Sequence, residues 1–240
     1  MSAELVVEQG ERVVVALLNR PHVRNALNTA LCETLRAVLD ESAADDDVSV
    51  LAIGSTQASC FSAGMDTKEA LLPGARTLDT LLALQWELET YPKPVVGMLG
   101  GYVIGGGAEL ALSMDVRIGS QSTVFGFPGT GYGLAQGSWH LVDVVGKSRA
   151  LELVLTGRRP DVQESLELGL LHELADDPDS RGRALAASLA RRSDVAMREA
   201  KRMIVAAWGR PQRERFDEER LVNKRLVASE MSARMGGGGG

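Results

Sequence analysis

The spacing of apolar residues in the N-terminal part of the chain predicts two strands followed by a helix. Leu5–Glu8 and Arg12–Leu18 are apolar or alternating and rich in β-branched residues, which predicts a hairpin that turns at Gly10. Apolar residues then recur at helical spacing over Asn28–Ala44, which opens with residues that commonly cap helices. The chain therefore begins as a β-hairpin followed by an amphipathic helix.

Strand and helix patterns then alternate before the chain becomes mainly helical. Short apolar runs predict buried strands at Val48–Ile53, Val95–Leu99 and Val116–Ile118. Helices are predicted at Leu78–Glu89, Ser148–Thr156, Val162–Leu168, Arg183–Arg192, Val195–Trp208 and Arg213–Met231. Alternating strands and helices favour an α/β layered architecture. The final Gly236–Gly240 segment is expected to be a flexible tail.

The run Gly105-Gly-Gly-Ala-Glu-Leu-Ala111 is the first candidate for chemistry. Glycines that open a helix leave free N–H groups at the positive end of the helix dipole, where they can hold negative charge on a ligand. Glu109 then lies in the first helical turn, beside whatever those amides hold. Close helix packing by the glycines, with Glu109 favoured by the dipole, is the structural alternative.

Composition narrows the class of protein. A chain of 240 residues with a net charge of −6 can bury a full core and is poorly suited to nucleic acid or an anionic membrane. Two cysteines and an N-terminus without a basic-then-apolar segment predict a reducing, cytoplasmic location. The three histidines are scattered, so no metal site is expected. A dinucleotide fingerprint is also absent from the glycine cluster.

A second loop could supply another backbone amide beside the glycine cluster. Cys60-Phe-Ser-Ala-Gly-Met-Asp-Thr-Lys68 follows the buried strand at Val48–Ile53. Gly64 can adopt a backbone conformation closed to other residues, which would point the N–H of Met65 into a cleft. Two such amides from separate loops would form an oxyanion hole.

Together these motifs resemble the crotonase family, the enoyl-CoA hydratases and isomerases. The matching pieces, in family order over nearly the whole chain, are Asn19-Arg-Pro21, Arg24-Asn-Ala-Leu27, Phe61-Ser-Ala-Gly-Met-Asp66, Pro94-Val-Val-Gly97, Gly105-Gly-Gly-Ala-Glu-Leu-Ala111, Asp115-Val-Arg-Ile118, Phe125-Gly-Phe-Pro128 and Val145–Gly157. The resemblance implies an α/β, crotonase-like (ClpP/crotonase) spiral of repeated ββα units over residues 1–190. It also implies a helical trimerisation region over residues 191–235.

The resemblance implies roles for individual residues. An acyl-CoA thioester oxygen would lie between the N–H groups of Met65 and Gly106, with Glu109 as the acid/base. Other positions implied to contact the substrate are Arg24, Ala26, Ala63, Gly64, Asp66, Lys68, Gly105, Gly129 and Tyr132. Arg24 and Lys68 meet phosphate oxygens in one interpretation and are solvated surface charges in the other. Coenzyme A arrives as part of the substrate, so no separate cofactor is implied. The assembly implied is a homotrimer or a dimer of trimers.

The chain departs from the family pattern at one position. Hydratases of the family carry a second glutamate directly after the segment Phe125–Pro128, and this chain has Gly129 there. The protein resembles a subgroup without that carboxylate. Tyr132, His140 and Asp143 are polar groups near the altered loop, and Trp139 is expected in a pocket wall or the core. Hydration or double-bond isomerisation of an enoyl-CoA is favoured, with a catalytically reduced acyl-CoA-binding protein as the main alternative. Decarboxylation and thioester hydrolysis also remain open.

Overall fold

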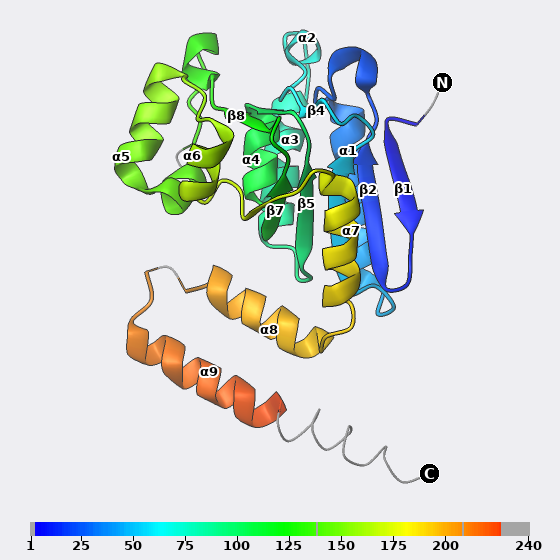
Figure 1. The fold of residues 1–240 in the computed structure, drawn as a ribbon, viewed down its shortest axis with the longest axis vertical. Helices are drawn as coiled ribbons and strands as arrows, with labels where there is room; N and C mark the ends of the chain where they lie inside the picture. The colour runs from blue at the N-terminus through cyan, green and yellow to red at the C-terminus, as the bar shows by residue number, and fades with distance from the viewer. Residues whose placement is uncertain (1–2, 138, 208, 227–240) are drawn as a thin grey trace.

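The chain folds into two β-sheets covered by helices (Figure 1). The computed structural model describes residues 3–137, 139–207 and 209–226. The strands are β1 (Leu5–Gln9), β2 (Val13–Leu18), β3 (Val50–Ser55), β4 (Cys60–Ser62), β5 (Val95–Leu99), β6 (Tyr102–Ile104), β7 (Val116–Gly119), β8 (Val124–Gly126) and β9 (Glu173–Leu174). The predicted hairpin is confirmed as the antiparallel pair β1–β2, and the predicted strand at Val95–Leu99 has the same bounds in the structure.

The order of strands in the two sheets reveals a repeated unit. The larger sheet has the order β1-β2-β3-β5-β7-β9 and the smaller one β4-β6-β8, and every pairing except β1–β2 is parallel. Three times, a strand of the larger sheet leads through a short turn into a strand of the smaller sheet and then into helical structure. This confirms the expected spiral of ββα units. The smaller sheet itself was not predicted.

Helices follow each unit and dominate the C-terminal part. They are α1 (Thr29–Ala44), α2 (Thr67–Ala70), α3 (Thr77–Glu89), α4 (Gly106–Leu112), α5 (Leu141–Thr156), α6 (Val162–Glu167), α7 (Pro178–Leu189), α8 (Asp194–Val205) and α9 (Gln212–Leu226), with short 3-10 turns at Pro21–Val23 and Gly129–Tyr132. Helices α7 and α5 begin five and seven residues earlier than predicted, at Pro178 and Leu141. Helix α7 is capped by the Asp177 side chain and has proline at its first turn. Helix α5 consists of two helical stretches that meet at a kink at Gly146, where φ is 76°.

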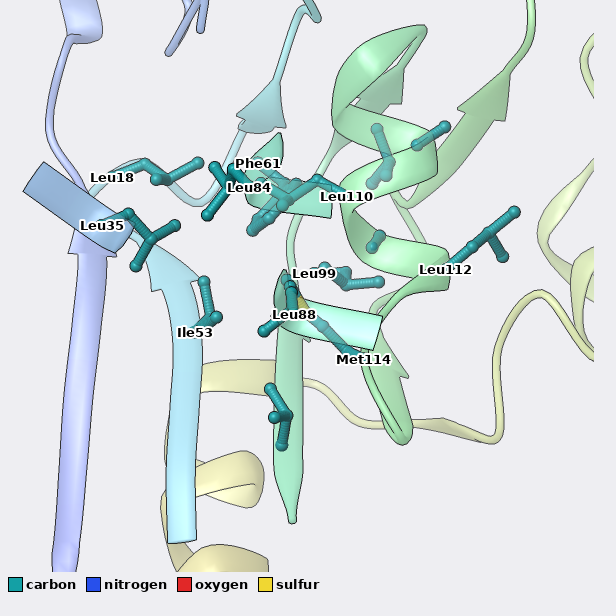
Figure 2. Close-up of a cluster of buried hydrophobic side chains, with 14 of the residues drawn as sticks. Leu18, Leu35, Ile53, Phe61, Leu84, Leu88, Leu99, Leu110, Leu112 and Met114 are labelled. Atoms are coloured by element: carbon teal, nitrogen blue, oxygen red, sulfur yellow. The ribbon is translucent and has the colours of Figure 1, made fainter. Parts of the chain in front are cut away.

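The larger sheet is buried on both faces. Alternate residues of β2 divide between the faces, with Val14, Ala16 and Leu18 on one side and Val13, Val15 and Leu17 on the other. The first face packs against α1, α3 and α4, where Leu35, Leu84 and Leu110 lie in the main core (Figure 2). Helix α7 covers the second face with Ala186. Two-sided burial explains why the strands appear in the sequence as nearly continuous apolar runs.

Helices α8 and α9 pack on each other and extend away from the two sheets (Figure 1). An ion pair connects α8 to the body, because Lys201 Nζ lies 2.7 Å from Asp115 Oδ2 and 3.0 Å from the Lys93 carbonyl oxygen. The predicted tail at Gly236–Gly240 lies outside the described residues, as does the part of the last predicted helix beyond Leu226. Within the described ranges, no helix has the length and apolar composition to cross a bilayer.

Candidate active site

Two segments far apart in the sequence run side by side and fix one wall of the site. The Leu27 N–H donates to the Gly64 carbonyl at 2.8 Å, and the Asp66 N–H donates to the Leu27 carbonyl at 2.9 Å. The Ala63 N–H also donates to the carbonyl of Arg24 at 2.9 Å. Because the residues on either side of Met65 face Leu27, the alternation of an extended chain turns the Met65 N–H away from it.

The Met65 N–H faces the first residues of α4. Gly64 has φ 96° and Gly105 has φ 57°, a region that favours glycine, so both turns depend on that residue type. A β-carbon on Gly64 would lie 2.8 Å from the Ile104 carbonyl oxygen, and one on Gly106 would lie 3.4 Å from the Met65 nitrogen. Among the backbone hydrogen bonds between described residues, neither the Met65 nor the Gly106 N–H has an acceptor. Two free donors therefore stand close together at the N-terminus of α4.

Glu109 lies in the first turn of α4, as the sequence predicts, and is 9% exposed. Its Oε1 accepts a hydrogen bond of 2.9 Å from the Gly137 N–H. Burial raises the pKa of the Glu109 carboxyl above its ordinary value, while the Gly137 hydrogen bond, the nearby His140 and the Gln85 amide oppose that rise. One carboxylate oxygen is thus held by the loop. The Gln85 side chain also hydrogen-bonds to this carboxyl, and Oε2 receives no bond from the Gly137 amide.

A cavity of about 620 Å³ joins these groups. Eleven of the twelve predicted site residues line it, namely Ala26, Ala63, Gly64, Met65, Asp66, Lys68, Gly105, Gly106, Glu109, Gly129 and Tyr132. The remaining wall is largely apolar and comes from Leu78, Leu81 and Leu82 of α3 together with Leu134. A cavity of this size with a few convergent polar groups is typical of a small-molecule site.

The predicted phosphate contacts lie in different surroundings. Arg24 is exposed and is not among the lining residues. Lys68 is exposed at the rim of the cavity. Asp66 has a structural task, because its carboxylate accepts from the Glu69 N–H at the start of α2 and pairs with Arg20 at 3.1 Å. The roles of Arg24 and Lys68 toward a ligand stay predictions.

Position 129 faces the cavity but has no room for a side chain. A β-carbon there would lie 2.7 Å from Gln136 Oε1 and 3.0 Å from the Leu134 carbonyl oxygen. Of the three polar residues that the sequence analysis named near this loop, Tyr132 lines the cavity, whereas His140 and Asp143 are not among its lining residues. His140 instead contacts Ser113 at 3.1 Å and Glu89 at 3.2 Å.

The sequence did not single out three residues that complete the site. Gln85 of α3 is fully buried, and its Nε2 donates to the Gly106 carbonyl at 3.2 Å, which orients the peptide beside the free amides. The sequence signal that could have indicated Gln85 is a glutamine among the apolar residues on one face of the predicted helix. Gln136 and Gly137 lie in an irregular loop whose approach to Glu109 depends on the tertiary structure. In the described part of the chain, no cluster of three or more metal-binding side chains occurs.

Comparison with known proteins identifies what the chain is similar to. Residues 8–237 match the family model described as enoyl-CoA hydratase/isomerase. The chain is 36% identical over 209 residues to the 2,3-dehydroadipyl-CoA hydratase of Escherichia coli, covering 84% of this chain and 82% of that protein. The crystal structure of an enoyl-CoA hydratase from Bacillus anthracis superposes with a TM-score of 0.89 at 26% identity, covering 95% and 92% of the two chains. An enoyl-CoA hydratase from Thermoplasma volcanium gives a TM-score of 0.86 at 26% identity, with coverage of 95% and 94%.

The buried carboxyl of Glu109 predicts a cost to stability. Burial raises the pKa of Glu109 in the folded protein above its value in the unfolded chain. The folded protein is therefore most stable at a pH below the unfolded-state pKa, where Glu109 is protonated in both states. This stability is lost as the pH rises through the folded-state pKa and the buried carboxyl ionises. Glu109→Gln removes the charge, and we expect it to increase the free energy of unfolding at pH 7 by on the order of 1 kcal/mol. Urea unfolding at pH 5 and pH 8 checks this, because the advantage of the variant should grow with pH. Glu11→Gln, at an exposed glutamate, is the control. An equal difference at both pH values would contradict the prediction.

Proposed function

The chain belongs to the enoyl-CoA hydratase/isomerase family and has its crotonase fold, and from that premise we propose that it hydrates a 2-enoyl-CoA or moves the double bond of an enoyl-CoA. The observation that carries the proposal is a single buried carboxylate, Glu109, beside two free backbone amides in one cavity. The thioester oxygen is held by the N–H groups of Met65 and Gly106. These amides stabilise the enolate that forms during reaction more than the ground-state carbonyl.

The proposed hydration uses one carboxylate twice. Glu109 Oε2 takes a proton from water as the water oxygen bonds to C3 of the acyl group. The electrons of the C2–C3 double bond pass to the thioester oxygen, where the two amides hold the enolate. When the enolate collapses, C2 takes the proton back from Glu109, giving a 3-hydroxyacyl-CoA. Isomerisation needs the same carboxyl to carry a proton between C2 and C4, with no water added.

The CoA part of the substrate is proposed to follow the wall made by the paired segments. Ala26, Ala63 and Gly64 line that side of the cavity, and their small side chains leave room for a narrow pantetheine arm. Lys68 at the rim, with Arg24 outside it, supplies positive charge for phosphate oxygens.

Binding of acyl-CoA without turnover is the second candidate, and one observation favours it. Position 129, where the resemblance places a second carboxylate, has no side chain, and Gln136 fills the adjacent space. An amide does not transfer protons at neutral pH, so Gln136 does not replace the second carboxylate, and Glu109 is left as the buried acid–base group of the site. This is the arrangement expected of the subgroup without the second glutamate.

Loss of the carboxyl separates the two candidates. Glu109→Gln should abolish hydration of crotonyl-CoA while leaving its affinity within about threefold, because the variant keeps the shape of the side chain and its acceptor for Gly137. Loss of enoyl absorbance measures turnover, and calorimetry measures binding. A wild-type protein that binds crotonyl-CoA yet leaves its absorbance and mass unchanged would exclude the hydratase and support the binding protein.

Removal of one amide tests the oxyanion hole. Gly106→Pro deletes the N–H at the first position of α4, a position where proline is tolerated in helices. We expect kcat to fall by a factor of about 10² to 10³. A β-carbon at this position also meets Leu81 Cδ2 at 2.8 Å, so Gly106→Ala, which keeps the N–H, is the matched control. Equal activity in the proline and alanine variants would reject the assignment of this donor.

We propose that the protein assembles as a homotrimer or a dimer of trimers through its C-terminal region, residues 191–235. Apolar side chains of α8 and α9 are exposed in the single chain, including Ile204 at 73% and Leu221 at 61%. Monomeric soluble proteins rarely expose large apolar patches, and such patches commonly mark interfaces between proteins. Sedimentation equilibrium should give three or six times the 25.6 kDa chain mass. A species of one chain mass at micromolar concentration would refute the assembly.

A further inference from the structure

The side chain of Gln136 occupies the space beside Gly129. Its Cβ and Oε1 would lie 2.8 Å and 2.7 Å from a β-carbon placed on Gly129, so the two positions compete for one volume. Gln136 also lines the cavity that holds Glu109. The place of a second functional group is therefore filled by a carboxamide that comes from seven residues further along the loop.

The orientation of that carboxamide follows from its hydrogen bond. The Gly129 N–H donates to Gln136 Oε1 at 3.0 Å. An N–H group needs an acceptor, so the oxygen and not the nitrogen must face Gly129. The NH₂ group consequently points away from the backbone of Gly129. Among the described residues it has no hydrogen-bond partner, and it is not among the buried polar atoms left unsatisfied.

The same loop places this amide next to Glu109. The peptide nitrogen of Gly137 donates to Glu109 Oε1 at 2.9 Å, and Gln136 immediately precedes it. Standard backbone dimensions then put the Gln136 Cα within about 6 Å of that oxygen. A side chain as long as glutamine spans this distance. Gln136 and Glu109 line the same cavity, so a ligand atom held by Glu109 would share that space with the Gln136 side chain.

We propose that Gln136 is a specificity-determining residue whose Nε2 donates a hydrogen bond to an oxygen attached to C3 of the acyl group. This inference rests on the proposed function, since it places C3 next to Glu109. The oxygen is the attacking water before addition and the 3-oxygen of the acyl chain afterwards. Gln136 moves no proton. It selects acyl-CoA thioesters with an acceptor oxygen at C3 over saturated ones.

A purely structural role makes a different prediction. If Gln136 only holds the loop through Gly129, any side chain with an acceptor oxygen at the same reach should serve equally well. Glutamate provides such an oxygen but has no N–H group at neutral pH. Methionine has a similar length and neither group. Comparison of Gln136→Glu with Gln136→Met therefore separates donation to the ligand from support of the loop.

The test measures binding of two ligands that differ at C3. Acetoacetyl-CoA has a carbonyl oxygen there, which only accepts hydrogen bonds, whereas butyryl-CoA has two hydrogens. Calorimetry on the wild-type protein should show tighter binding of acetoacetyl-CoA. In both Gln136→Met and Gln136→Glu this preference should fall by about three- to tenfold, the usual effect of one neutral hydrogen bond. The affinity for butyryl-CoA should change less than about twofold. Gln121→Met, at an exposed glutamine outside the cavity, is the matched control.

Two outcomes would overturn the inference while leaving the proposed function intact. One is a wild-type preference retained in Gln136→Glu, which would assign Gln136 to holding the loop. The other is an equal loss of affinity for both ligands in the two variants, which would indicate general damage to the cavity. Failure of the wild-type protein to bind either thioester would instead reject the proposed function itself.

Discussion

The close approach of the Gly64 loop to the first residues of α4 is the constraint on which the site depends. Any side chain at Gly64 would meet the Ile104 carbonyl oxygen at 2.8 Å, and φ there is 96°. The approach is held by the ladder between Leu27 and the residues around Met65. It places two unpaired amides side by side with no cost of reorganisation during a reaction. The sheets and the core serve to keep these two backbone segments in register.

Helix α3 contributes residues both to the hydrophobic core and to the candidate active site. Leu84 and Leu88 pack in the main core (Figure 2). Leu81 and Gln85 line the cavity from the same helix. Because Gln85 donates to the Gly106 carbonyl, a shift of this helix would move the Gly106–Gly107 peptide, which directly follows the free Gly106 N–H. A buried carboxylate next to this packing is expensive, and its cost is reduced by the Gly137 N–H and the Gln85 amide. The site is therefore built as part of the core.

The elements that depend on local residue patterns could be predicted from the sequence. The hairpin, the strand at Val95–Leu99 and the glycine-led helix bearing Glu109 all follow from periodicity and turn chemistry. The smaller sheet was not predicted, because its strands are only three residues long and pair with segments distant in sequence. The Glu109–Gly137 and Gly129–Gln136 hydrogen bonds likewise join residues whose meeting depends on the fold. Arg24, whose role toward a ligand stays a prediction, is not among the residues that line the cavity.

The shared volume of positions 129 and 136 also constrains how this chain can change. A β-carbon at 129 would lie 2.7 Å from Gln136 Oε1 and 2.8 Å from its Cβ, so a side chain enters at 129 only if Gln136 moves or is replaced by a smaller residue. A smaller residue without an acceptor at 136 leaves the Gly129 N–H without its hydrogen bond. Substitutions at the two positions are therefore coupled, because each changes the space or the hydrogen bond on which the other depends.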